Sequence, residues 1–179
     1  MKDGFETSEL VEKTLRFHCP RWEQLPDIAL YMDQVTGYIN DIFRPLSPEG
    51  QDEPLLTKAM VNNYVKLRVI RPPENKKYSR EHMAYLITIC ALKQVFSIPE
   101  ITYLIRTQMD VCSVEKAYDY LCAQLEETLH KAFAGEALDM PQSDAQLLVM
   151  RSAQAWADKV FLRKRLEYEY GADSPTAKK

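Results

Sequence analysis

The sequence predicts a mainly all-α protein that carries one short β-ribbon and a helical hairpin near its C-terminal end. Along most of the chain, apolar side chains recur at the three- and four-residue spacing of helices. Segments that contain proline and glycine separate these stretches and predict loops. Apolar residues make up 46% of the 179 residues and charged residues 27%, which is ordinary for a globular protein with a core of its own.

The stretch over residues 56–105 organises the prediction for the rest of the chain. Thr57 is expected to cap a helix, and residues 72–75 (PPEN) predict a turn that leads into a short ribbon. From about Arg80 to Gln94 a second helix is apolar on nearly every side, so we expect it in the middle of the core. Residues 97–100 (SIPE) match a capping box and predict the start of a third helix.

Three parts of this stretch match the sequence pattern of a known family. Residues 57–72 follow the pattern SVRTLRYYERIGLLKP in step, Tyr78-Ser79 takes the place of a wing-closing Tyr-Ser pair, and residues 96–101 (FSIPEI) match FSLEEI. On these residues the stretch resembles the MerR-type winged helix-turn-helix. The whole chain resembles an uncharacterised bacterial family, a domain of unknown function that carries such a core. The signature positions within residues 57–72 are Tyr64, Leu67, Val69, Ile70 and Pro72.

The resemblance implies a MerR-like winged helix-turn-helix core with a small two-stranded wing. Residues 32–43 would form its supporting helix, and the helix after Thr57 would be the recognition helix. Two features depart from the family's pattern. Residues 44–55 (RPLSPEGQDEPL) predict a loop about three times as long as the turn of a standard helix-turn-helix. Arg68 stands where the family usually has glycine, so either Arg68 adopts a mildly strained positive φ or the turn is built differently.

The remaining apolar patterns predict further helices. A short helix is expected from Ser8 to about Phe17. The apolar stripe from Val114 to Phe133 ends at Gly135, and a long helix capped by Ser143 or Asp144 is expected to reach about Tyr170, so that the two helices pack as a hairpin. The expected organisation is an N-terminal helix plus the MerR-like core over residues 1–110, the C-terminal hairpin over residues 111–171 and a disordered tail over residues 172–179.

The distribution of charge favours an anionic partner. The chain as a whole has a formal net charge of −3. Between Thr57 and Arg80, however, seven Lys and Arg side chains stand against one acidic residue, Glu74, so this window carries +6 and the remainder −9. A basic window in an acidic body is the expected footprint of a DNA-contacting element. A solvated basic surface without a partner is the alternative interpretation.

Eight polar side chains in this window are the candidates for DNA contact. On the recognition helix, Asn62 or Asn63 could pair with the N6 and N7 atoms of adenine, whereas lysines suit phosphates. Lys76 and Lys77 on the ribbon, and Arg71 on its other side, are expected to touch the DNA backbone or the minor groove. Either asparagine could instead be an ordinary polar surface residue. The full predicted set is Lys58, Asn62, Asn63, Lys66, Arg71, Lys76, Lys77 and Arg80.

Other chemistry finds little support in the sequence. Neither a glycine-rich phosphate loop nor an H-E-x-x-H or G-x-S-x-G motif occurs, so we expect no catalytic residue and no cofactor. A single E-x-x-H at residues 127–130 and cysteines without C-x-x-C spacing do not predict a metal site. The chain shows no signal-peptide pattern and no apolar run of membrane length. Free cysteines fit a reducing cytoplasm best; they are Cys19, Cys90, Cys112 and Cys122.

The sequence therefore favours a non-enzymatic, sequence-specific DNA-binding protein, a transcriptional regulator whose partner is double-stranded DNA. The alternative is a helical protein-interaction adaptor that keeps this fold without binding DNA. The acidic remainder and the long loop over residues 44–55 favour that alternative. The sequence identifies neither an operator nor a small-molecule effector.

The long C-terminal helix also predicts a homodimer. Its apolar residues are spread too widely for one partner helix to cover, and such a patch rarely stays in water. Two DNA half-sites would in addition need two recognition helices in fixed relation. The alternative is that residues 8–17 and the segment around Trp22 fold back over the patch. The residues expected at the dimer interface are Leu147, Met150, Phe161 and Leu162.

Overall fold

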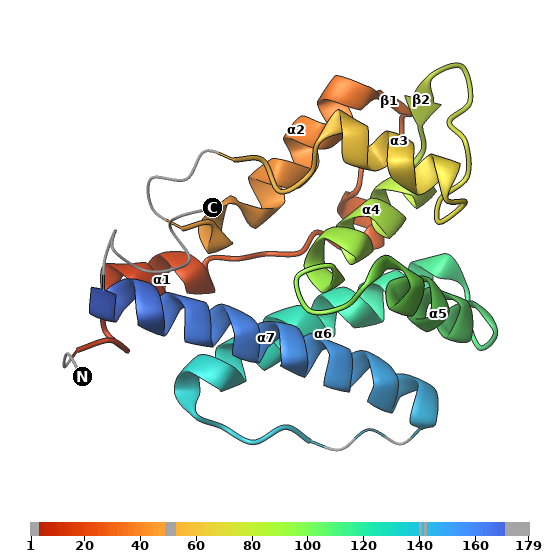
Figure 1. Ribbon diagram of the computed structural model, residues 1–179. Helices are drawn as coiled ribbons and strands as arrows, with labels where there is room; N and C mark the ends of the chain where they lie inside the picture. Colours follow the sequence, from red (N-terminus) through yellow and green to blue (C-terminus); the bar gives the residue numbers. More distant parts are fainter. Residues whose placement is uncertain (1–3, 49–52, 140, 142, 171–179) are drawn as a thin grey trace.

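The computed structural model describes residues 4–48, 53–139, 141 and 143–170 (Figure 1). In these ranges the chain forms seven α-helices and one two-stranded antiparallel sheet, which confirms the mainly helical fold class. None of these helices is long and apolar enough to cross a membrane. The tail expected at residues 172–179 lies outside the described residues. The elements are α1 (Glu9–Leu15), β1 (Leu30–Tyr31), α2 (Met32–Phe43), α3 (Lys58–Lys66), β2 (Lys77–Tyr78), α4 (Arg80–Leu92), α5 (Ile98–Met109), α6 (Val114–Ala134) and α7 (Asp144–Tyr170).

Several helix ends lie where the sequence predicts them. The hydroxyl oxygen of Thr57 accepts a hydrogen bond from the N–H of Met60 at 3.2 Å and so caps α3. At the start of α5, the N–H of Ser97 donates to Oε2 of Glu100 at 2.7 Å, as in the predicted capping box. Gly135 ends α6 with a φ of 69°, a left-handed conformation that glycine adopts without steric cost.

Helix α4 occupies the middle of the molecule (Figure 1). It contacts α2, β2, α5, α6 and α7, so its side chains meet neighbours in every direction. Leu86, Ile87 and Ile89 have no exposed surface. The prediction that this apolar helix is enclosed is therefore confirmed. One cluster of buried hydrophobic residues extends around it from the N-terminal segment to α7, so the two expected parts of the chain share a core.

The sheet differs from the ribbon that the sequence predicts. Strand β2 pairs with β1, which precedes α2, and the register joins Leu30 to Tyr78 and Tyr31 to Lys77. The expectation that Arg71 lies on the other side of a local ribbon is wrong, because residues 71–73 form no strand. The physical reason is that Pro72 and Pro73 have no N–H to donate to a ladder.

A tight turn over residues 74–77 leads into β2. Lys77 donates its N–H to the carbonyl of Glu74 at 2.8 Å, and between them Asn75 and Lys76 have φ values of 49° and 62°. Two successive left-handed residues are typical of a type I′ turn, which reverses the chain with the twist that a β-ribbon needs. The turn leaves Lys76 exposed at its tip.

Helices α6 and α7 pack closely but do not form the predicted antiparallel hairpin. Val149, near the start of α7, lies with Ala117 of α6 around one cavity, while Phe133, at the end of α6, stacks edge-on against Phe161 with ring centroids 5.2 Å apart. The two helices therefore run in the same direction (Figure 1). The nine residues 135–143 can span about 30 Å, which is about the length of a 21-residue helix, so the chain can return to the start of α6 before α7 begins.

Most of the predicted dimerisation patch is covered within the chain, and the N-terminal segment covers Phe161. Phe5 is 1% exposed, and its ring lies 5.6 Å from that of Phe161. Met150 is 2% exposed and Leu147 is half-buried, whereas Leu162 remains 60% exposed. The prediction that these residues lack a cover within the chain is therefore wrong except at Leu162. A homodimer stays a prediction, but this patch no longer supports it.

Buried cations join α7 to the connector after α2. Lys164 has no exposed surface, and its Nζ donates to the carbonyl of Ser47 at 2.9 Å and pairs with Oε2 of Glu167 at 3.0 Å. Burial lowers the pKa of Lys164. Nη2 of Arg163 donates to the carbonyl of Leu46 at 2.9 Å. These bonds fix the end of α2 from the far side of the core.

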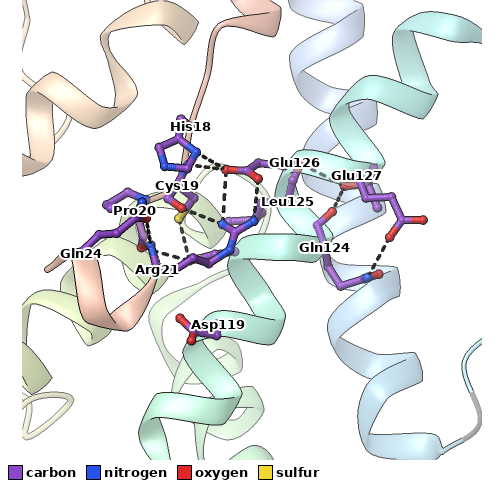
Figure 2. A network of polar contacts seen from close by, with 12 residues as sticks. His18, Cys19, Pro20, Arg21, Gln24, Asp119, Gln124, Leu125, Glu126 and Glu127 are labelled. Atoms are coloured by element: carbon purple, nitrogen blue, oxygen red, sulfur yellow. Dashed lines mark hydrogen bonds and ion pairs between the residues drawn. The ribbon is translucent and has the colours of Figure 1, made fainter.

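A polar network holds the segment between α1 and β1 on α6 (Figure 2). Nη2 of Arg21 donates to Oε2 of Glu126 at 2.6 Å, and Nδ1 of His18 lies 2.9 Å from Oε1. Burial raises the pKa of Glu126, but the hydrogen bonds from Arg21 and from the N–H of Cys19, with the nearby positive charges, lower it more. The net result is a pKa below the ordinary value of 4.5.

We predict that Ile87→Ala lowers the free energy of unfolding by about 2–5 kcal/mol, because it leaves a cavity at a fully enclosed site. Ile28→Ala is the matched control, since Ile28 is 68% exposed, and it should change stability by less than about 0.5 kcal/mol. Urea unfolding followed by circular dichroism measures both. Equal stability of the two variants would contradict the central position of α4.

A second prediction concerns Glu126 and pH. Because its pKa is lowered on folding, the carboxylate stabilises the native state above pH 4.5, and this contribution is lost as the pH falls through the lowered pKa. At pH 7, Glu126→Gln should therefore cost about 1–2 kcal/mol. The difference from the wild type should shrink as the pH falls below 4.5. Exposed Glu136→Gln should show no such convergence, and a pH-independent difference for Glu126→Gln would refute the assignment.

Candidate nucleic-acid interface

Helix α3 is divided into a buried and an exposed face. Val61 has no exposed surface and Tyr64 is 4% exposed, so these two side chains anchor the helix on the core. Asn62, Asn63 and Lys66 are exposed on the other side. Met60, one residue before Val61, is 38% exposed, so the buried face is narrow. The helix thus presents a polar face to solvent.

The start of α3 is fixed by side chains from two other helices. Asn40 of α2 receives the N–H of Leu56 on its Oδ1 at 2.9 Å and donates from Nδ2 to the carbonyl of the same residue at 3.0 Å. Lys93, at the end of α4, donates to the carbonyl of Leu55. Burial lowers the pKa of Lys93. These bonds place α3 against the core despite the long connector before it.

The chain leaves α3 through a left-handed residue, as one of the two sequence-based alternatives requires. Arg68 has a φ of 57°. The N–H of Val69 returns to the carbonyl of Tyr64 at 2.9 Å, and Ile70, which is 3% exposed, anchors the chain again. Arginine at this φ is strained because its Cβ lies close to the backbone. The strained turn therefore lies between α3 and the basic residues that follow it.

Six of the eight predicted side chains are exposed, and two, Lys77 and Arg80, are partly buried. Lys66, Arg71 and Lys76 are exposed, and the carbonyl of Arg71 accepts a hydrogen bond from Nε2 of His82 at 3.1 Å. Lys58 is also exposed but forms an ion pair with Asp33 of α2. An ion pair between two exposed side chains contributes little, so a phosphate could replace Asp33.

Two members of the predicted set are held within the fold. Nζ of Lys77 lies 5.1 Å from the centre of the Tyr31 ring, across the two-stranded sheet. The guanidinium of Arg80 lies 5.8 Å from the centre of the Trp22 ring, and its side chain is only 21% exposed. Arg80 therefore packs as a structural cation, and the expectation that it contacts DNA is not supported by its position.

Sequence reasoning missed an apolar groove beside the end of α3. It lies between the turn after α3 and helix α5, and Tyr103 and Leu67 on its rim are 74% and 55% exposed. The available signal was that Tyr103 falls outside the stripe by which α5 meets the core. The groove is lined by Leu67, Val69, Ile98, Pro99, Thr102, Tyr103 and Arg106.

One family of proteins matches the part of the chain that contains α3 and the groove. The family model described as "Domain of unknown function (DUF1836)" matches residues 20–121, more than half of the chain. The chain belongs to this family. The DUF1836 region includes both strands and helices α2 to α5, ends within α6 and leaves α7 outside. The family's description assigns no activity, and comparisons with curated proteins and with solved structures found no match.

We predict that Arg68→Gly raises the free energy of unfolding by about 0.5–1 kcal/mol. Glycine removes the steric cost of the left-handed conformation, and its greater freedom in the unfolded chain offsets part of that gain. Lys66→Gly is the matched control at the last residue of α3, where glycine relieves no strain, and it should lower stability by up to about the same amount. Denaturant midpoints of the two variants, compared with the wild type, measure both changes in stability. A loss of stability in Arg68→Gly would show that the arginine side chain contributes more than the strain costs.

Proposed function

We propose that this chain is a non-enzymatic, sequence-specific DNA-binding protein and a transcriptional regulator, built on a MerR-like winged helix-turn-helix core. In this proposal α3 enters the major groove of double-stranded DNA. The exposed segment from Arg71 to Lys76 lies on the flanking backbone. The support comes from the pattern of residues 57–101 and from the surface that these residues present.

The observation that carries the proposal is the exposed polar face of α3. An α-helix with its side chains is about 10–12 Å across, which fits a major groove about 12 Å wide. The nine residues of α3 would extend about 13.5 Å along that groove. Asn62 and Asn63 are exposed and carry the amide groups that pair bidentately with adenine. The helix contains no acidic side chain that would repel phosphates. Because α3 is anchored by Val61 and Tyr64, this face has a fixed orientation.

The basic residues around α3 supply the non-specific part of the proposed binding. Lys66 lies at the end of the helix, Arg71 follows the strained turn and Lys76 stands at the tip of the type I′ turn. All three side chains are exposed, and lysine and arginine at such positions contact phosphates and release counterions. Their contribution should be independent of base sequence.

The groove beside α3 favours a second candidate function, a protein-interaction adaptor. Its rim residues Leu67 and Tyr103 expose large apolar surfaces that DNA phosphates would not cover. Arg106 at the same groove could pair with an acidic group of a protein partner. Aromatic and arginine side chains are enriched where proteins meet. The adaptor would use the α3–α5 side of the molecule without any contact to bases.

Mutations on α3 and its flanks should separate base reading from phosphate binding. Lys66→Ala with Lys76→Ala should weaken binding to every DNA and reduce the slope of log K against log salt by up to about two. Asn63→Ala should cost about 1–3 kcal/mol on the preferred site and little on random DNA. Fluorescence anisotropy over a series of salt concentrations measures both effects. If Asn63→Ala is neutral, Asn62→Ala should show the site-specific loss.

Two further variants provide the controls. Lys159→Ala removes an exposed charge from α7, outside the proposed interface, and should leave both the affinity and the salt slope unchanged. Tyr103→Ala should leave DNA binding intact, because the groove belongs to the adaptor alternative. A folded wild-type chain without salt-dependent affinity for DNA, or equal losses in Lys159→Ala and Lys66→Ala with Lys76→Ala, would overturn the proposal.

A further inference from the structure

Two buried cysteines far apart in the sequence meet between the N-terminal part of the chain and α6. Sγ of Cys19 lies 2.8 Å from Sγ of Cys122, although the residues are 103 positions apart. Neither side chain has any exposed surface. Cys122 lies within α6, whereas Cys19 belongs to the irregular segment between α1 and the turn at Trp22–Gln24. A short displacement of either side chain would bring the sulfur atoms to bonding distance, about 2.05 Å.

The segment around Cys19 is held in register against α6 by contacts on both sides of the sulfur (Figure 2). The N–H of Cys19 donates to Oε1 of Glu126 at 2.8 Å. The hydroxyl of Tyr118 donates to the carbonyl of Pro20 at 2.7 Å, and Arg21 pairs with Glu126. Tyr118, Cys122 and Glu126 follow each other at four-residue spacing and so share one face of α6. The fold therefore presents the two sulfur atoms to each other through a set of directed bonds.

We propose that Cys19 and Cys122 are a modification site that forms a reversible disulfide, with hydrogen peroxide or another small hydroperoxide as the oxidant. One sulfur, as thiolate, attacks a peroxide oxygen and becomes a sulfenic acid, while the O–O bond breaks and the leaving hydroxide takes up a proton. The other sulfur then attacks the sulfenic sulfur, the S–S bond forms and a second water leaves. In sum, two thiols and one peroxide give one disulfide and two waters, and two electrons pass from sulfur to oxygen.

Burial determines how fast the pair reacts. Burial raises the pKa of Cys19 well above its ordinary value, so only a small fraction of the Cys19 side chains are thiolates at neutral pH. Oxidation is therefore slow and restricted to small reagents. Cys90 is also buried, which raises its pKa to about 12. Among the described residues, the contact between two cysteine sulfur atoms that the structure shows is that of Cys19 with Cys122. Cys112 is half-buried and directs its Sγ to the carbonyl of Gln108 at 3.6 Å.

A metal site is a less suitable use for the two thiols. Metals held by two cysteines need further ligands. Across the part of the chain that the structure describes, no three His, Cys, Asp or Glu side chains are grouped so that they could hold an ion. A disulfide needs only the two sulfur atoms that are already adjacent. The bond would close a loop that contains α2 to α5, and so restrict the unfolded chain over the whole DUF1836 core.

The test uses the full chain in its folded state. After reduction and removal of the reductant, the protein is treated with hydrogen peroxide for hours, quenched in acid, and alkylated under denaturing conditions. We expect alkylatable thiols to fall from four to two, a mass loss of two hydrogen atoms and a Cys19–Cys122 peptide in the digest. The thermal midpoint should rise by roughly 5–15 °C and return on addition of dithiothreitol.

Matched variants identify the pair. Cys112→Ala should still form the cross-link. Cys122→Ala should form no intramolecular disulfide, so its three remaining thiols should stay alkylatable. The peptide map of the wild type decides the proposal even if Cys122→Ala fails to fold. Retention of four thiols after prolonged treatment, a disulfide between any other two cysteines, or a sulfinic acid at Cys19 without a cross-link would overturn it. None of these readouts depends on DNA binding, so this test and that of the proposed function fail independently.

Discussion

Helix α4 presents apolar side chains in every direction, so the native fold must shield it from water on every side. Leu86, Ile87 and Ile89 are enclosed by α2, α5, α6 and α7, each of which contributes one apolar face. This requirement explains why the DUF1836 region and α7 share one core although α7 lies outside the family match. It also explains why α7 bears apolar residues around much of its surface, because it faces α4, α5, α6 and the N-terminal segment together.

The same arrangement buries one face of α3 and leaves the other exposed to solvent. Its two anchors, Val61 and Tyr64, reach the core, while bonds from Asn40 and Lys93 hold the residues just before the helix. The helix is therefore oriented by α2 and α4 without being covered. Lys164 and Arg163 of α7 support this from the far side, because they bind carbonyls in the connector just after α2. A rigid scaffold with one polar helix face exposed is the arrangement that a DNA-reading helix requires.

Local chemistry made much of this fold predictable from the sequence. The cap at Thr57 and the stop at Gly135 each follow from the residue type and its neighbours. The positive φ of Arg68 was one of two alternatives that the family's glycine at this position left open. Pairings between distant segments were not predictable. The partner of β2, the parallel course of α6 and α7, and the cover that Phe5 gives to Phe161 depend on which apolar faces meet in three dimensions. For the candidate site, the exposed asparagines were predictable, but the engagement of Arg80 with the ring of Trp22 required the tertiary structure.

Selection of bound fragments from a random pool of double-stranded DNA tests the central claim most directly, because every possible short site is present in the pool. The full chain and a variant with Asn62→Ala and Asn63→Ala are used in parallel, with circular dichroism to show that both are folded. The account predicts that the wild type enriches a defined sequence motif and that the variant still retains DNA at low salt but enriches no motif. Fragments recovered by the folded wild type that match the input pool in sequence would contradict it.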